Sequence, residues 1–307
     1  MRRLREGAYA NPTDSENHAN LANLTLQPAS MTNLRRAAVA GSWYPRSATA
    51  LAAELDRYLE RAESAEIAGE LTAIVVPHAG LIYSGPVAAH AYRLLRGRAV
   101  DTFVLVGPSH FVAFDGVALW ASGGFETPFG VAGIDGARAG QLLSSSPIMR
   151  EHPAAHAREH SLEMQLPFIK HLAPRATIVP ALMGYQTAST ASVLGAALAD
   201  VVRGRSALLV VSTDLSHYHD AGVASQLDAV VIDCVARFDP DGLQHALDAR
   251  PDHACGGGPL VAVMRAARAL GATDAAVLRY ADSGDVSGDK SSVVGYLAAA
   301  FGRFEVR

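Results

Sequence analysis

The chain alternates between short apolar segments and longer amphipathic ones, and this alternation limits the available folds more than any other feature. Residues 72–76, 102–106 and 207–212 are almost entirely apolar, as expected for strands buried on both faces. Helical patterns, such as those over 47–63 and 188–203, lie between such segments. Strands that alternate with helices are typical of layered α/β folds. We therefore predict an α/β layered sandwich, with a mainly parallel or mixed central sheet flanked by helices.

Prolines mark two of the other predicted helices. Pro86 suits the first turn of a helix over 86–96. Pro167 should kink or break a helix over 160–172. The remaining predicted strands cover 116–121, 176–180, 275–280 and 292–299, and the remaining helices cover 136–144, 222–237, 240–248 and 258–270.

Residues 35–303 contain no internal repeat and no linker, so we predict that they form a single domain. Residues 1–34 are predicted to be a flexible N-terminal extension, because small polar residues prevail there without periodicity. Met31 is an alternative start. Residues 304–307 are predicted to be a short tail.

Composition excludes several classes of function. The net charge is −4, which leaves no basic field to hold nucleic acid or an anionic membrane. No run of 18 apolar residues occurs, so we expect no membrane span. Cys234 and Cys255 are the only cysteines and cannot form a disulfide framework, so we expect a cytoplasmic location. Cys234 lies in an amphipathic helical pattern and is assigned to packing.

Three of the apolar strands lead into a histidine. His78 follows 72–76, His110 follows 102–106 and His217 follows 207–212. Ligands of open α/β sheets bind beyond the carboxyl ends of the strands, so we expect the three imidazoles in one crevice. Cys255 precedes the helix over 258–270 and joins them. Its place at a helix start predicts a lowered thiol pKa.

A further motif, over residues 158–167, places His160 and Glu163 three positions apart. On a helix they would share a face and bring an imidazole and a carboxylate to the same crevice. The alternative is an ordinary helix-start signature. Two histidines and a cysteine resemble the Fe(II) triad of two histidines and one carboxylate, with cysteine in the third place unless Asp214 or Glu163 supplies the ligand.

Six segments of the chain together resemble the Memo family (mediator of ErbB2-driven cell motility), whose microbial members are called AmmeMemoRadiSam system protein B. The resemblance extends over residues 35–303. The matching segments are 40–45, 77–80 with 83–85, 107–110, 159–164, 212–217 and 254–256.

The resemblance implies a fold similar to that of class III extradiol, non-haem iron dioxygenases. It implies that His78, His110 and Cys255 bind a metal, with Fe(II) expected first and zinc or copper as alternatives. His217 matches the neighbouring site histidine, and we expect it to act in catalysis together with Asp214. In the dioxygenases the third ligand is a glutamate, so the cysteine argues against ring cleavage. The residues expected around these ligands or against the substrate are His160, Glu163, Tyr83 and Ser109.

Three functions stay open at this point. The first is a metal-dependent oxidoreductase with His217 as acid–base. The second is a metal-assisted hydrolase in which His217 or Asp214 takes a proton from metal-bound water. The third is a non-catalytic module whose crevice binds a peptide or partner. The expected partners are a small molecule or peptide in the crevice, and AMMECR-type and radical SAM proteins of the same system.

Overall fold

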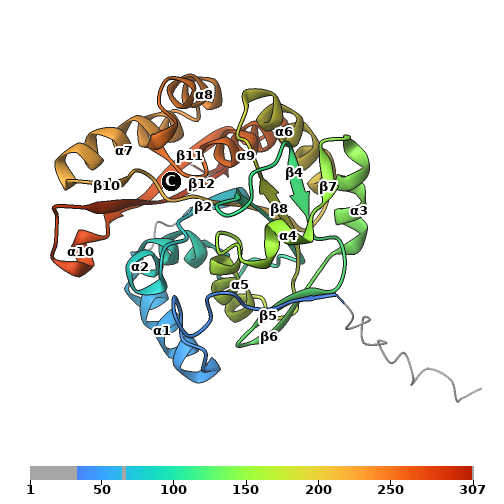
Figure 1. Ribbon diagram of the computed structural model, residues 1–307, viewed down its shortest axis with the longest axis horizontal. Helices are drawn as coiled ribbons and strands as arrows, with labels where there is room; N and C mark the ends of the chain where they lie inside the picture. Colours follow the sequence, from blue (N-terminus) through green and yellow to red (C-terminus); the bar gives the residue numbers. More distant parts are fainter. Residues whose placement is uncertain (1–32, 64–66, 306–307) are drawn as a thin grey trace, which may run out of the picture.

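A mixed nine-stranded sheet runs through the molecule, with helices on both of its faces (Figure 1). The computed structural model describes residues 33–63 and 67–305. The strand order is β10-β12-β2-β9-β3-β8-β4-β7, and β11 pairs antiparallel with β12 as well. This architecture confirms the predicted α/β sandwich. The strands are β2 (Gly69–Val76), β3 (Thr102–Pro108), β4 (Val117–Leu119), β7 (Met149–Glu151), β8 (Thr177–Met183), β9 (Ala207–Ser212), β10 (His217–His219), β11 (Asp274–Asp282) and β12 (Val293–Phe304).

The middle of the sheet is parallel. β2, β9, β3 and β8 run in one direction, whereas β12 and β4 are antiparallel to their neighbours β2 and β8. Val76 pairs with Ser212, so β2 and β9 end side by side. The carboxyl ends of the parallel strands therefore meet at one edge, where His78 and His110 follow them.

Two apolar layers, one on each face of the sheet, explain why the central strands are apolar over several successive positions. In β2, Ala73 and Val75 belong to one core and Ile74 and Val76 to the other. The first core is covered by α3 (Gly136–Ser145), α6 (Ala188–Val202), α7 (Ala221–Ala236), α8 (Pro240–Ala249) and α9 (Gly257–Ala269). The second is covered by α1 (Ala48–Arg61), α2 (Leu81–Tyr92) and α5 (Leu166–Leu172).

Two helices differ from their predicted bounds by more than two residues, the helices predicted over 86–96 and 160–172. α2 begins at Leu81, so Pro86 lies inside the helix and not in its first turn. Leu81 and Val87 are buried in the second core. We attribute the earlier start to this burial, because it offsets the cost of the backbone hydrogen bond that Pro86 cannot make. The predicted break at Pro167 is confirmed, because α5 starts at Leu166 with the proline in its first turn. Residues 161–162 form a turn and 163–165 a short 3-10 helix, η2 (Glu163–Gln165).

Several short elements were not predicted. A second sheet contains β1 (Leu34–Arg35), β5 (Gly124–Thr127) and β6 (Gly130–Gly133), and the predicted domain start at residue 35 falls inside β1. Residues 1–32, which are most of the predicted extension, lie outside the described residues, as do residues 306–307. At the other end of the domain, β12 reaches Phe304, the first residue of the predicted tail. Among the helices of residues 33–63 and 67–305, none combines the length and the hydrophobicity that a membrane span requires. The other short helices are η1 (Arg93–Leu95), α4 (Pro153–Ala157), η3 (Pro251–His253) and α10 (Gly284–Ser287).

Candidate metal centre

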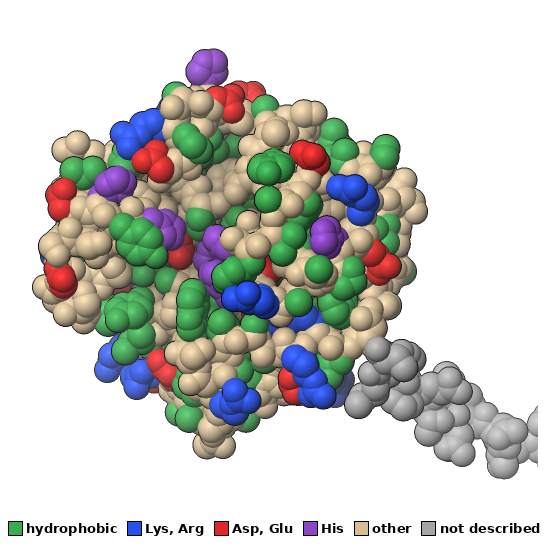
Figure 2. Space-filling model, in the orientation of Figure 1, with side chains coloured by type: hydrophobic (Ala, Val, Ile, Leu, Met, Phe, Trp, Pro, Cys, Tyr) green, Lys and Arg blue, Asp and Glu red, His purple; other side chains and the backbone are tan. Residues whose placement is uncertain are grey.

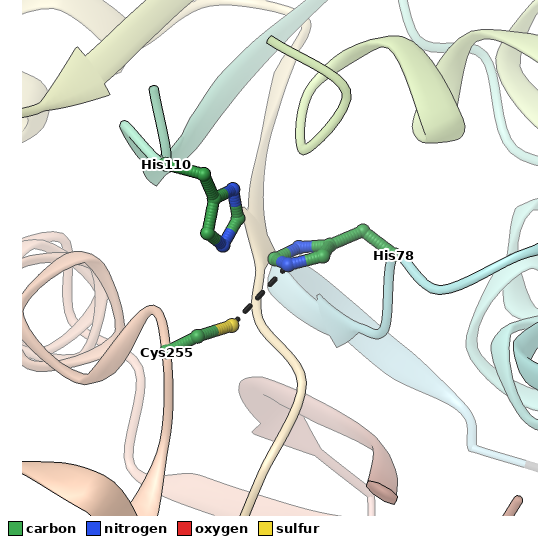
Figure 3. Close-up of side chains that lie close together, drawn as sticks. All are labelled: His78, His110 and Cys255. Carbon is green, nitrogen blue, oxygen red and sulfur yellow. Dashed lines mark hydrogen bonds between the residues drawn. The ribbon is translucent and has the colours of Figure 1, made fainter. Parts of the chain in front are cut away.

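His78, His110 and Cys255 come together at the carboxyl edge of the parallel strands (Figure 3). One ligand atom from each lies within 4.8 Å of the others, and Cys255 Sγ is 3.2 Å from His78 Nε2. Metal bonds to nitrogen and sulfur measure about 2.0–2.3 Å, so two ligands of one ion lie at most roughly 4.6 Å apart. Small side-chain rotations would therefore bring all three donors to a single ion.

The His110 ring is oriented by Glu159. Glu159 Oε1 lies 2.9 Å from His110 Nδ1, and Oε2 accepts a hydrogen bond of 2.6 Å from the His110 backbone N–H. Burial opposes ionisation of this carboxyl, but the hydrogen bonds from His110 and from the Ser161 backbone outweigh burial and lower the Glu159 pKa to about 2. A carboxylate accepts only, so in the neutral imidazole of His110 the proton lies on Nδ1 and the lone pair on Nε2. Metal-binding histidines typically have such a partner.

Glu159 was not among the predicted site residues. It stands next to His160 in one of the segments that carry the family resemblance, but its contact with His110 joins residues 49 positions apart. Local sequence carries no signal for such a contact.

His78 is almost fully buried and held at two points. Its backbone N–H donates to Asp214 Oδ1 at 2.7 Å, and its Nδ1 lies 2.9 Å from the Ser212 hydroxyl. Burial holds the pKa of His78 well below its usual range, and the neighbouring His110 adds to this. The imidazole is therefore neutral at physiological pH, the state in which histidine binds metals.

Cys255 lies against the end of β9. A Cβ at Gly256 would come within 2.8 Å of the Ser212 carbonyl oxygen, so only glycine allows this approach. Cys255 Sγ accepts a hydrogen bond of 3.3 Å from the Asp214 backbone N–H.

The prediction of a lowered Cys255 pKa is wrong: the surrounding protein groups raise it. Burial raises the pKa of this thiol, and the Asp214 carboxylate raises it further. The N–H groups at the start of α9 have other partners: Gly256 donates to the Thr213 hydroxyl and Gly258 to the Gln186 side chain. Ionisation of the thiol therefore needs another positive charge nearby, and a coordinated metal ion would supply one.

Asp214 and His217 border the cluster. Burial raises the pKa of Asp214, and the positive charge of a protonated His217 opposes the rise. Asp214 Oδ2 lies 4.0 Å from His78 Nε2. His217 is on β10, where its Nδ1 is 2.8 Å from the Leu215 carbonyl oxygen. It is not one of the three converging ligands.

His160 packs against the two histidines of the cluster, whereas Glu163 lies elsewhere. The His160 ring stacks on His110 at 4.6 Å between ring centroids, and burial lowers its pKa to about 4. The predicted helix face shared by His160 and Glu163 is wrong, because residues 161–162 form a turn. Glu163 is fully buried and instead binds Arg35, the Tyr44 hydroxyl and two backbone N–H groups of the N-terminal segment.

Ser109 and Tyr83 have different surroundings. The Ser109 hydroxyl donates to the Val112 carbonyl oxygen, which shapes the loop that carries His110. Tyr83 lines a separate cavity of about 330 Å³ between α1, α2 and β11.

The cluster is partly exposed, because His110 is exposed and Cys255 is half-buried, whereas His78 is buried. Figure 2 shows several histidine side chains spread over one face of the molecule, some of them near its middle among hydrophobic side chains. A cavity of about 360 Å³ borders Cys255 and is lined in part by Tyr185 and Leu247. Exposed aromatic residues border the site. The rings of Trp43 and Phe111 lie 4.4 Å and 5.8 Å from the His160 ring, between centroids. Tyr185 lines the cavity beside Cys255, and Tyr218 follows His217 in the chain.

Comparison with known proteins agrees with the motifs. Residues 35–300 match the family model described as Memo-like protein. A MEMO1 family protein of Methanothermobacter thermautotrophicus is 38% identical over 272 residues, which cover 86% of this chain and 98% of that protein. A MEMO1 family protein of Methanosarcina acetivorans is 41% identical over 268 residues, with the same shares covered.

The fold has a solved counterpart. A crystal structure of an uncharacterised protein from Escherichia coli K12 superposes with a TM-score of 0.51 at 16% identity, covering 74% of this chain and 99% of that one. This likeness concerns the fold alone. The family model and the archaeal relatives extend over nearly all of the described chain, and the chain therefore belongs to the Memo-like protein family.

Proposed function

We propose that this protein is a metal-dependent oxidoreductase whose Fe(II) ion is bound by His78, His110 and Cys255. One observation carries the proposal: the Nε2 atoms of two histidines and a cysteine sulfur converge, while Nδ1 of each ring is held by another partner. Imidazole and thiolate suit iron, zinc and copper, and three protein ligands leave coordination positions open. Zinc or copper would accept the same donors.

A bound Fe(II) ion would supply activation of O₂ or of a substrate at its open positions. The protein's own groups provide the rest. Asp214, whose pKa burial raises, and His217 hold and transfer protons beside the cluster. His160, neutral above pH 4, stacks on the His110 ring and keeps it in place. The substrate, a small molecule or peptide, would enter past the exposed aromatic residues.

The resemblance to class III extradiol dioxygenases supports a redox reaction in this crevice. The dioxygenases have a glutamate where this chain has Cys255, so we do not propose ring cleavage. We place the protein in the cytoplasm, as component B of an AmmeMemoRadiSam system with AMMECR-type and radical SAM partners. This placement depends on the family resemblance alone.

A binding module is the second candidate. Trp43, Phe111, Tyr185 and Tyr218 are all exposed. Exposed aromatic side chains are enriched where proteins bind partners. Partner binding that survives loss of the metal ligands would favour this candidate, and a zinc-only protein would favour a metal-assisted hydrolase.

Metal analysis of anaerobically purified protein tests the proposal. We expect near-stoichiometric iron in the unmodified protein and a marked loss in Cys255→Ser and His78→Ala, with unchanged circular dichroism. Cys234→Ser is the matched control, because Cys234 is buried in α7 away from the cluster. Full metal content in Cys255→Ser would mean that another group, such as Asp214, is the third ligand.

A further inference from the structure

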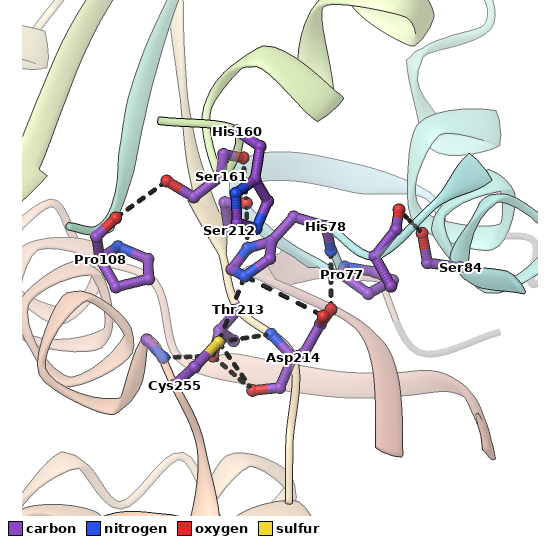
Figure 4. Close-up of polar contacts among 12 residues, drawn as sticks. Pro77, His78, Ser84, Pro108, His160, Ser161, Ser212, Thr213, Asp214 and Cys255 are labelled. Carbon is purple, nitrogen blue, oxygen red and sulfur yellow. Dashed lines mark hydrogen bonds and ion pairs between the residues drawn. The ribbon is translucent and has the colours of Figure 1, made fainter. Parts of the chain in front are cut away.

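A buried chain of hydrogen bonds contacts Nδ1 of the His78 ring, and Figure 4 labels its members Ser212 and Ser161. Ser212 is its centre: the hydroxyl contacts His78 Nδ1 at 2.9 Å, the Gln165 amide at 2.8 Å and the Ser161 carbonyl oxygen at 2.7 Å. The Tyr92 hydroxyl donates to Gln165 Oε1 at 3.0 Å. Ser212, Gln165, Ser161 and Tyr92 are all fully buried.

The direction of every bond in this chain follows from its acceptor-only ends. Gln165 also contacts the Pro77 carbonyl oxygen at 3.0 Å, and a carbonyl can only accept, so the Gln165 amide nitrogen must face Pro77 and Ser212. The Ser161 carbonyl likewise takes the single hydroxyl proton of Ser212. Ser212 then has no proton left for His78, and His78 Nδ1 must donate to the Ser212 oxygen.

We propose that Ser212 is a positioning residue that fixes His78 as the Nδ1–H tautomer and so presents the Nε2 lone pair towards Cys255. The other tautomer has a competing acceptor, because Cys255 Sγ lies 3.2 Å from Nε2. The Asp214 carboxylate, 4.0 Å from the same atom, is beyond hydrogen-bond distance. A proton on Nε2 would block metal binding at that atom. Metal binding by the Nε2 lone pair rests on the proposed function, whereas the assignment of the tautomer does not.

Long-range ¹⁵N NMR of the metal-free protein reads the tautomer directly. We expect the His78 signals to show a protonated Nδ1 and an unprotonated Nε2. A protonated Nε2 would overturn the proposal, and this measurement needs no variant to fold.

Two variants then separate positioning from general destabilisation. Ser212→Ala removes the acceptor of Nδ1–H, and we expect a mixed or inverted tautomer and metal binding weakened about 10–100-fold, as for partners of other metal-binding histidines. Ser161→Ala is the matched control: this equally buried hydroxyl donates to the Pro108 carbonyl oxygen and does not touch His78. Equal losses of affinity in both variants, or an unchanged tautomer in Ser212→Ala, would refute the role of Ser212.

Failure of the metal centre would look different. If the unmodified protein bound neither Fe(II) nor Zn(II), the proposed function would fall. The tautomer measurements on metal-free protein would still decide the role of Ser212.

Discussion

Glu159→Gln tests how strongly the buried carboxylate supports the loop that carries His110. The carboxylate accepts hydrogen bonds from four donors: His110 Nδ1 and the backbone N–H groups of His110, His160 and Ser161. Glutamine keeps one acceptor oxygen and places an NH₂ group against the remaining donors. At least one buried N–H then loses its partner, at a cost of about 1–3 kcal/mol.

The pKa shift of Glu159 gives an independent value for its contribution to the free energy of unfolding. The pKa of Glu159 falls from 4.5 to about 2 in the folded protein, and 1.36 kcal/mol per unit corresponds to about 3 kcal/mol of stability at neutral pH. A group with a depressed folded pKa stabilises above its unfolded pKa, so this contribution is complete above pH 4.5 and is lost as pH falls towards 2. At pH 3 roughly 1 kcal/mol should remain.

Urea unfolding followed by circular dichroism at pH 7 and pH 3 measures the contribution of Glu159 to the free energy of unfolding at each pH. We expect Glu159→Gln to lower the free energy of unfolding by about 3 kcal/mol at pH 7 and by clearly less at pH 3. Glu60→Gln, on the exposed face of α1, is the control and should change stability by no more than about 0.5 kcal/mol. A loss that is the same at both pH values would refute the electrostatic reasoning.

Two further predictions concern the N-terminal part of the chain. Glu163→Ala leaves Arg35 buried without its ion-pair partner and should destabilise the fold by about 3–5 kcal/mol, measured by chemical unfolding; a loss below about 1 kcal/mol would contradict the role of Glu163 as anchor of residues 35–44. Protein that starts at Met31 should unfold at nearly the same temperature as the full chain, because residues 1–30 offer no apolar pattern to bury, and a large drop in melting temperature would show that they pack on the domain.

The central sheet was predictable because its strands are buried on both faces and therefore apolar at successive positions. The same pattern placed His78 and His110 beyond the carboxyl ends of β2 and β3, two parallel strands that flank β9, so their convergence at one edge of the sheet followed from topology. The position of Cys255 just before a helix was predictable from the sequence. The direction of its pKa shift was not, because the burial of the thiol and the partners of the α9 N–H groups depend on tertiary contacts.

Other features had no local signal. β1, β5 and β6 are two to four residues long and too short to show a period. The anchoring role of Glu163 depends on contacts with residues 119–128 positions away, and a periodic pattern over 160–172 favoured a continuous helix instead. Ser212 and Glu159, which orient the two histidine rings, likewise act across distant parts of the chain.

The ligand set itself is tested most directly by X-ray absorption at the K-edge of the bound metal, measured on anaerobically loaded protein. We expect one sulfur and two imidazole ligands in the unmodified protein, with the sulfur lost in Cys255→Ser and retained in Cys234→Ser. A spectrum of the unmodified protein with only nitrogen and oxygen ligands would contradict a metal centre built from His78, His110 and Cys255.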